Sequence, residues 1–177
     1  MKRLKIFLLI SICFVLSNCA TYNKQVSTTN IEETYQKNKT LEHRFYLIGD
    51  AGNTKKDSVN LTLKRVSKQL ESENKNTTVL FLGDNIYPKG LPKKGDKNRE
   101  LAAYRLKVQT DISQNFKGDV IFVPGNHDWY NDGLEGLKRQ QKFVEKQLGK
   151  NSFLPKNGCP IKTIDVDENI VIIFVDS

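Results

Sequence analysis

Three short apolar runs, each followed by glycine and then by aspartate or asparagine, form the most regular pattern in this chain. Unbroken apolar runs of this kind are typical of strands that are covered on both faces, as in a parallel sheet. Open α/β sheets bind their ligands just beyond the carboxyl ends of such strands. We therefore expect three strands whose tips bring polar side chains to one site. The runs occupy positions 45–48, 79–82 and 120–123, and Asp50, Asp84 and Asn126 follow them.

The segments between the apolar runs have the periodicity of amphipathic helices packed on a sheet. The three polar positions lie 34 and 42 residues apart, which is enough for two right-handed βαβ units. This order predicts a layered α/β fold, a βαβ sheet with flanking helices. The residues expected to face the sheet are Val59, Leu63, Val66 and Leu70 in the first helix and Leu101, Tyr104, Val108 and Ile112 in the second.

A third amphipathic helix and a β-hairpin are predicted after the third strand. Residues 162–166 alternate weakly between polar and apolar side chains, as expected for the first strand of the hairpin. Residues 169–177 contain a continuous apolar run, so we expect them to form a second, fully buried strand. The apolar face of the third helix would consist of Leu134, Leu137, Val144 and Leu148.

The first nineteen residues have the features of a bacterial export signal. A basic start precedes an apolar stretch at 6–16, which is too short to span a bilayer comfortably and suits a signal-peptide core. The following residues, 16–19, resemble a lipobox, so we expect lipid attachment at Cys19 and an exported, membrane-anchored lipoprotein; ordinary signal cleavage is the alternative. Residues 20–44 are rich in polar side chains and predict a flexible tether, and residues 45–177 the folded domain.

The chain carries a net charge of +8, from 28 Lys and Arg against 20 Asp and Glu. This balance favours anionic partners such as phosphorylated substrates, although ordinary solubility charge is the simpler interpretation. The positive charge is too diffuse to indicate nucleic-acid binding. Four lysines after the second strand could steer phosphate esters or could belong to a solvated loop: Lys89, Lys93, Lys94 and Lys97.

The polar residues at the predicted strand tips favour metal chemistry. Asp50, Asp84 and Asn126 offer oxygen atoms, and Tyr87 offers a phenol. Carboxylates on adjacent strand tips would repel one another unless cations lay between them. A two-metal site of this kind activates water and holds both reacting oxygens of a phosphoryl group. The competing interpretation is that these residues only form turns.

Three motifs resemble the first signature blocks of the calcineurin-like metallophosphoesterases: Gly49-Asp50-Ala51-Gly52, Gly83-Asp84-Asn85-Ile86-Tyr87 and Gly125-Asn126-His127-Asp128. The tyrosine in the second block is similar to that of the purple acid phosphatase branch. The resemblance implies that Asp50 and Tyr87 bind a first metal, an iron, that Asp84 bridges two metals, and that Asn126 binds the second, which is Zn, Mn or Fe. It also implies that His127 contacts the phosphate or protonates the leaving group, with Asp128 orienting its ring.

The family pattern has two further blocks that contain histidines, whereas this chain has only His43 and His127. We therefore expect the chain to be the N-terminal half of a longer phosphoesterase, truncated after the first half of the fold. The expected function is hydrolysis of a phosphorylated small-molecule or macromolecular substrate. The alternative is a non-catalytic lipoprotein that binds a metal, a phosphate group or a protein. A nuclease is disfavoured by Tyr87 and by the lack of a basic stripe interleaved with aromatic residues.

Overall fold

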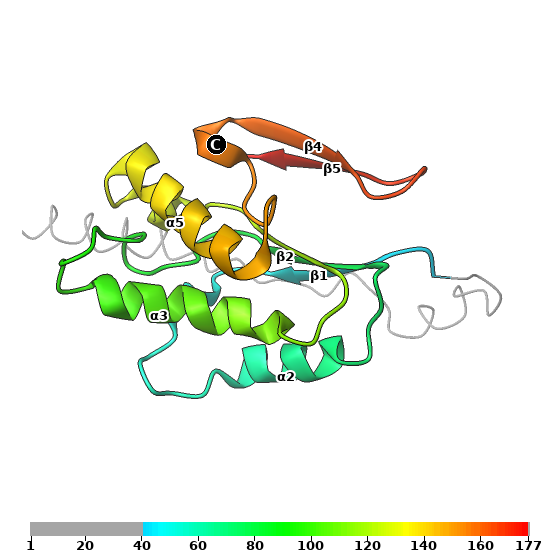
Figure 1. Ribbon diagram of the computed structural model, residues 1–177, viewed down its shortest axis with the longest axis horizontal. Coiled ribbons are helices and arrows are strands. Elements are labelled where there is room, and N and C mark those ends of the chain that lie inside the picture. Colours follow the sequence, from blue (N-terminus) through cyan, green and yellow to red (C-terminus); the bar gives the residue numbers. More distant parts are fainter. Residues whose placement is uncertain (1–40, 177) are drawn as a thin grey trace, which may run out of the picture. The chain divides into compact units, whose positions relative to one another are not determined.

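The computed structural model describes residues 41–176, which contain a three-stranded parallel sheet with flanking helices and a two-stranded hairpin (Figure 1). This arrangement confirms the predicted α/β fold. The sheet consists of β1 (Arg44–Ile48), β2 (Thr77–Phe81) and β3 (Asp119–Phe122), in that order, and the hairpin of β4 (Ile161–Asp165) and β5 (Val171–Val175). The helices are α2 (Leu61–Leu70), α3 (Arg99–Thr110), α4 (Asn126–Trp129) and α5 (Gly133–Leu148).

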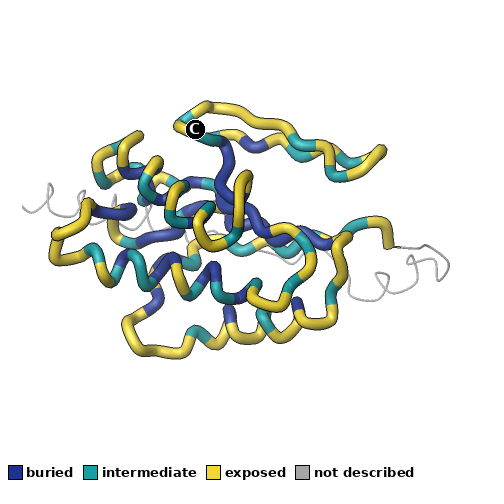
Figure 2. Tube along the Cα trace, viewed as in Figure 1, coloured by how far each residue is buried: buried dark blue, intermediate teal, exposed yellow. Residues whose placement is uncertain are grey.

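The central strand β2 aligns the three strand tips. Phe81, its last residue, pairs with Ile48 of β1 and with Phe122 of β3, so the three strands end at one level. All five residues of β2 are buried, as expected for a strand with neighbours on both sides and cover on both faces (Figure 2). The loops that follow the strands therefore begin at the same edge of the sheet.

Each face of the sheet packs on a different layer. On one face, Phe81 and Phe122 stack at 4.2 Å between ring centroids and join a core that includes residues of α2, α3 and α5. On the other face, Leu80 and Ile121 pack against Phe174 of the hairpin. Burial of one such large side chain stabilises the fold by about 1.5–3 kcal/mol, so these two layers hold the sheet and its strand tips in place.

The second helix, α3, buries a different face from the one that the periodicity predicts. Its buried residues include Arg105, Leu106 and Gln109, whereas Tyr104 and Val108 are only partly buried. The reason is that the Arg105 and Gln109 side chains donate hydrogen bonds to carbonyl groups of the loops and of α3 itself. Polar side chains that meet such partners can replace apolar ones in the core.

Further predictions about burial are also wrong, among them those for Val59 and for β5. Val59 lies before the first residue of α2 and is 67% exposed, so it takes no part in the core. Strand β5 is not fully buried, since only Phe174 in it is buried and its neighbours alternate outward. Among residues 41–176 the two strands of the hairpin pair only with each other and have one covered face, and Figure 2 accordingly shows the hairpin mostly in the colours of exposed and intermediate residues.

The predictions for the N-terminus fall outside the part of the chain that the structure describes. They comprise the signal peptide at 1–19, lipid attachment at Cys19 and nearly all of the tether at 20–44. Within residues 41–176, no helix has both the length and the apolar character needed to cross a membrane.

Candidate metal centre

The strand tips bring Asp50, Asp84 and Tyr87 together, although Asp50 and Tyr87 are 37 residues apart in the chain. The Tyr87 hydroxyl lies 2.5 Å from Oδ1 of Asp50 and 2.7 Å from Oδ2 of Asp84. Three oxygen atoms from two loops therefore meet at one point, beyond the carboxyl end of the sheet.

Backbone contacts join the loops that carry these side chains. The Gly52 amide donates to the Asp84 carbonyl at 3.1 Å, and the Tyr87 amide donates to the Gly52 carbonyl at 3.0 Å. A Cβ atom at Gly52 would lie 2.4 Å from the Asp84 carbonyl oxygen, so only glycine permits this approach. The glycine that closes the first motif thus sets the distance between the two aspartates.

Asp84 also contacts the third loop. Its Oδ1 accepts a hydrogen bond of 3.1 Å from the backbone amide of His127, while its Oδ2 faces Tyr87. A Cβ atom at Gly125 would lie 2.3 Å from Oδ1 of Asp84, so the glycine of the third motif leaves the space that this carboxylate occupies. Asp84 therefore accepts hydrogen bonds from both of the other motifs, from Gly52 at its backbone carbonyl and from His127 at its side chain.

The amide of Asn126 is oriented by a neighbouring phenol. Its Nδ2 donates to the Tyr130 hydroxyl at 2.7 Å, which leaves the side-chain carbonyl oxygen available. An amide oxygen is a suitable ligand for a hard cation. Both Asn126 and Tyr130 are exposed, so a ligand can reach this oxygen from solvent.

The His127 ring is held by a backbone carbonyl. Its Nδ1 lies 2.7 Å from the Pro88 carbonyl oxygen, an acceptor, so Nδ1 carries a proton. The ring lies 4.3 Å from the Tyr87 ring and 5.0 Å from the Tyr130 ring, measured between centroids. The second ring nitrogen, Nε2, forms no hydrogen bond with any described residue, and it can therefore accept or hold a proton beside the candidate ligands.

Asp128 does not orient the His127 ring, which corrects the role implied by the resemblance. Its carboxylate is buried and accepts hydrogen bonds from the backbone amides of Gly125, Asn85 and Ile86, at 2.9, 3.1 and 3.1 Å. Burial raises the pKa of Asp128 to about 6, and the amide donors oppose this rise. These hydrogen bonds join the second and third loops through the carboxylate. The backbone amides around Asp128 require acceptors, and its carboxylate provides them. The His127 ring instead bonds to the carbonyl of Pro88.

The comparison with protein families agrees with this geometry. A family model described as calcineurin-like phosphoesterase matches residues 43–171, which include all three loops. The chain belongs to this family. Membership supports metal-dependent hydrolysis of phosphate esters as the general activity. No curated protein and no solved structure is significantly similar to the chain.

The donor set of this phosphoesterase domain fits a hard cation. The Tyr87 hydroxyl has a single proton, which cannot be donated to Asp50 and Asp84 at once. Hydrogen bonds to Asp50 and then to Asp84 raise the pKa of the Tyr87 phenol above its ordinary value. A cation that replaced this proton would be surrounded by oxygen ligands, which iron, zinc and manganese sites use.

Among residues 41–176, no group of three or more His, Cys, Asp and Glu side chains is arranged to hold a metal ion. The candidate centre combines two carboxylates with a phenol and an amide, and it is therefore a different kind of donor set. His43, the other histidine in the chain, bonds to the Thr78 hydroxyl at the opposite end of the sheet. The described residues thus place no imidazole beside Asp50 and Asp84 except His127.

Sequence reasoning missed three residues that support the phosphoesterase site. Asn85 donates to the Val123 carbonyl and to Asp128, Tyr130 orients Asn126, and Arg105 contacts the first two loops. Asn85 and Tyr130 lie within or next to the motifs, so their positions could have drawn attention. Arg105 lies in a helix, and the sequence indicated its role only by a charged residue between two apolar ones.

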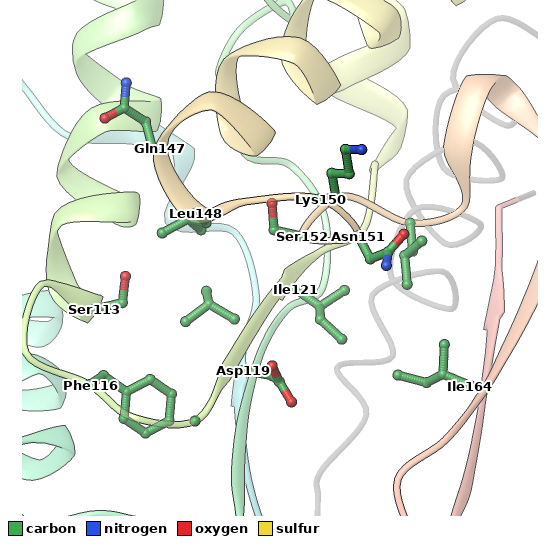
Figure 3. Close-up of a pocket in the computed structure, with 13 residues that line it drawn as sticks. Ser113, Phe116, Asp119, Ile121, Gln147, Leu148, Lys150, Asn151, Ser152 and Ile164 are labelled. Carbon is green, nitrogen blue, oxygen red and sulfur yellow. The ribbon is translucent and has the colours of Figure 1, made fainter. Parts of the chain in front are cut away.

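One groove in the surface lies away from this centre. A groove of about 450 Å³ runs beside β3 and is lined by Asp119, Ile121 and Ser152, among others (Figure 3). It lies near the start of β3, whereas Asn126 follows the end of that strand. The four lysines after Tyr87 are exposed, and Lys93 pairs with Asp132 at 3.6 Å.

Proposed function

We propose that this domain hydrolyses phosphate esters by a two-metal mechanism of the purple acid phosphatase type. The observation that carries the proposal is the Tyr87 phenol, which lies between the carboxylates of Asp50 and Asp84. A phenol at this place would be a ligand for ferric iron only if the metal displaced its proton, which would be released to solvent. Asp50 and Tyr87 would then hold the first metal, Asp84 would bind both, and Asn126 would hold the second.

When bound, the two metals supply an activated water and neutralise charge on the phosphoryl group. His127 is the group of this chain that can move a proton at the reacting bond. With Nδ1 protonated and bound to the Pro88 carbonyl, a proton on Nε2 can pass to the oxygen of the leaving alcohol. The neutral ring that remains is the tautomer that Pro88 already stabilises, so the transfer requires no change of ring position.

Colour provides a direct test of the proposal. The purified protein, supplied with ferric iron and zinc, should show a visible phenolate-to-iron absorption band and should hydrolyse a phosphate monoester. Tyr87→Phe should lose the band, because no phenolate remains, and should retain its melting temperature. A colourless wild-type protein that binds only zinc or manganese would contradict the purple acid phosphatase assignment.

A second candidate function is binding without catalysis. It is favoured by the absence, within residues 41–176, of a cluster of three or more His, Cys, Asp and Glu ligands. In this case the exported lipoprotein would bind a metal, a phosphate group or a protein partner at the same strand tips. Metal-loaded protein that binds inorganic phosphate but never releases alcohol from a phosphate ester would support this function over hydrolysis.

We also propose that the protein acts outside the cytoplasm, anchored by a lipid at Cys19. The support is the apolar stretch at 6–16 and the lipobox-like sequence after it. Cells grown with a labelled fatty acid should incorporate the label into the wild-type protein and not into Cys19→Ser. Label in both proteins, or in neither, would contradict lipid attachment at this residue.

A further inference from the structure

A buried arginine of α3 contacts the first two loops of the candidate centre. Arg105 is 9% exposed, and its Nε donates to the Thr54 carbonyl at 3.0 Å. Its Nη2 donates to Oδ1 of Asn53 at 3.3 Å, and its Nη1 donates to the carbonyl of Tyr87. One guanidinium therefore joins the loop that follows Asp50 to the residue that carries the candidate phenolate.

This arginine forms no salt bridge with any residue from 41 to 176. Burial lowers the pKa of Arg105, and no nearby carboxylate counteracts this effect. A buried charge without a counter-ion is costly, so ion pairing does not explain its presence in the core. What the guanidinium provides is a rigid, planar set of donors that can hold several carbonyl oxygens at fixed positions.

The Tyr87 loop is incompletely packed on one side. A cavity of about 130 Å³ lies beside it, and its lining includes Tyr87, Pro88, Leu101 and Arg105. A loop with empty space on one side lacks van der Waals contacts there and can shift toward the gap. The hydrogen bond from Arg105 to the Tyr87 carbonyl opposes such a shift.

We propose that Arg105 is a positioning residue that sets the distance between the Asp50 loop and Tyr87, and so arranges the ligands of the first metal before it binds. The inference rests on the proposed function, in which Asp50 and Tyr87 hold that metal. Arg105 is not one of the proposed metal ligands. It acts through the side chain of Asn53 and the backbone carbonyls of Thr54 and Tyr87, and together with the two Gly52 backbone hydrogen bonds it fixes the geometry of the centre.

The test compares metal binding in the wild-type protein and in Arg105→Met. Zinc and ferric iron are titrated by calorimetry, and the iron-loaded proteins are examined for the phenolate absorption band. Loss of a group that orients metal ligands weakens binding about 10–100-fold. We expect a loss of this size in Arg105→Met, with a weaker or shifted band, and near-UV circular dichroism that still shows a folded domain.

Arg99→Met is the matched control. Arg99 lies on the same helix, is partly buried, and donates from its guanidinium to the carbonyl of Pro92. The Arg99→Met substitution therefore removes a similar side chain and a similar hydrogen bond, and it leaves the contacts of the Asp50 loop and of Tyr87 unchanged. Metal affinity in this variant should stay within about twofold of the wild type, since it lacks the contacts that carry the proposed effect.

The possible outcomes separate this inference from the proposed function. Equal metal affinity in Arg105→Met, Arg99→Met and the wild type would overturn the role of Arg105. A wild-type protein without an absorption band would overturn the iron assignment, and the zinc titration would still decide the role of Arg105. If Arg105→Met does not fold, Asn53→Ala and Arg105→Lys replace it, and wild-type affinity in both of them would contradict the proposal.

Discussion

Two aspartates of the candidate centre have a backbone conformation that glycine adopts most readily. Asp50 and Asp84 have φ angles of 55° and 52°, in the left-handed region. Glycine would adopt this conformation with less strain, and aspartate and asparagine tolerate it better than most residues. The carboxylates at these two positions are therefore present at some cost to the backbone, as is common at functional sites.

Asp84→Asn tests the carboxylate of Asp84 with little change to the backbone. Asparagine tolerates the left-handed conformation, so we expect the melting temperature to stay nearly unchanged. Loss of a preorganised charge at the reacting centre lowers turnover about 10²–10³-fold, and loss of a bridging ligand should reach at least that size. The measurement is kcat/KM for a phosphate monoester; turnover equal to that of the wild type would refute the bridging role.

A second prediction concerns the close approach of the first two loops. In Gly52→Ala the new methyl group would lie 2.4 Å from the Asp84 carbonyl oxygen, so the loops must separate. Overpacking of this kind costs about 1–3 kcal/mol in the free energy of unfolding, and metal affinity should fall with it. Gly49→Ala is the control, because no atom lies within 4 Å of a Cβ there. Similar denaturant midpoints for the two variants would disprove the explanation.

The carboxylate of Glu73 joins the turn after α2 to the sheet. Glu73 accepts a hydrogen bond of 2.8 Å from the Tyr46 hydroxyl and one of 3.3 Å from Thr77, and it pairs with Arg44. The bond from Tyr46, followed by the contacts with Arg44, lowers the pKa of Glu73 below its ordinary value of 4.5. Glu73 thus connects β1 and β2 at the end opposite the candidate centre.

This contact predicts a pH-dependent loss of stability. A carboxylate with a lowered pKa in the folded state stabilises the protein above its unfolded value of 4.5, and this contribution disappears as the pH falls through the folded value. Glu73→Gln should therefore lower the free energy of unfolding by about 1 kcal/mol at pH 7 and by much less at pH 3. Urea titrations at both pH values measure this, with the exposed Glu71→Gln as control. An equal loss at both pH values would count against the ionic contribution.

For the described domain as a whole, the hairpin has two unlike faces. Phe174 is 4% exposed and packs against the sheet, whereas Ile161, Val171, Ile173 and Val175 are each more than half exposed. A contiguous apolar surface of this kind favours self-association. The two strands of the hairpin pair with no other strand of the described domain, and unpaired strand edges increase that tendency.

Substitutions on the outer face should change aggregation, whereas substitutions on the buried face should change stability. Ile173→Thr keeps a β-branched side chain, so we expect little change in melting temperature and less aggregation in light scattering. Phe174→Ala removes a buried aromatic ring and should reduce the free energy of unfolding by about 3–5 kcal/mol. If Ile173→Thr aggregates as much as the wild type, the outer face of the hairpin is not the surface responsible.

The sequence by itself determined the sheet, the positions of its tips and the family. These features depend on local patterns: an apolar run predicts a strand, and the glycine and aspartate after it predict the loop that leaves the sheet. The prediction of three βαβ-spaced strands is confirmed, and the candidate ligands Asp50, Asp84 and Tyr87 lie together as that spacing requires. Their role in binding metal stays a prediction.

Only the tertiary structure decided which polar groups support the site. Whether Asp128 contacts the His127 ring or the backbone, and whether α3 buries Arg105, depends on which carbonyls and amides the folded loops leave without partners. Those partners come from segments far apart in the chain, so no local pattern records them. The exposure of β5 has a similar cause, because burial of a strand depends on the layers around it and not on its own apolar residues.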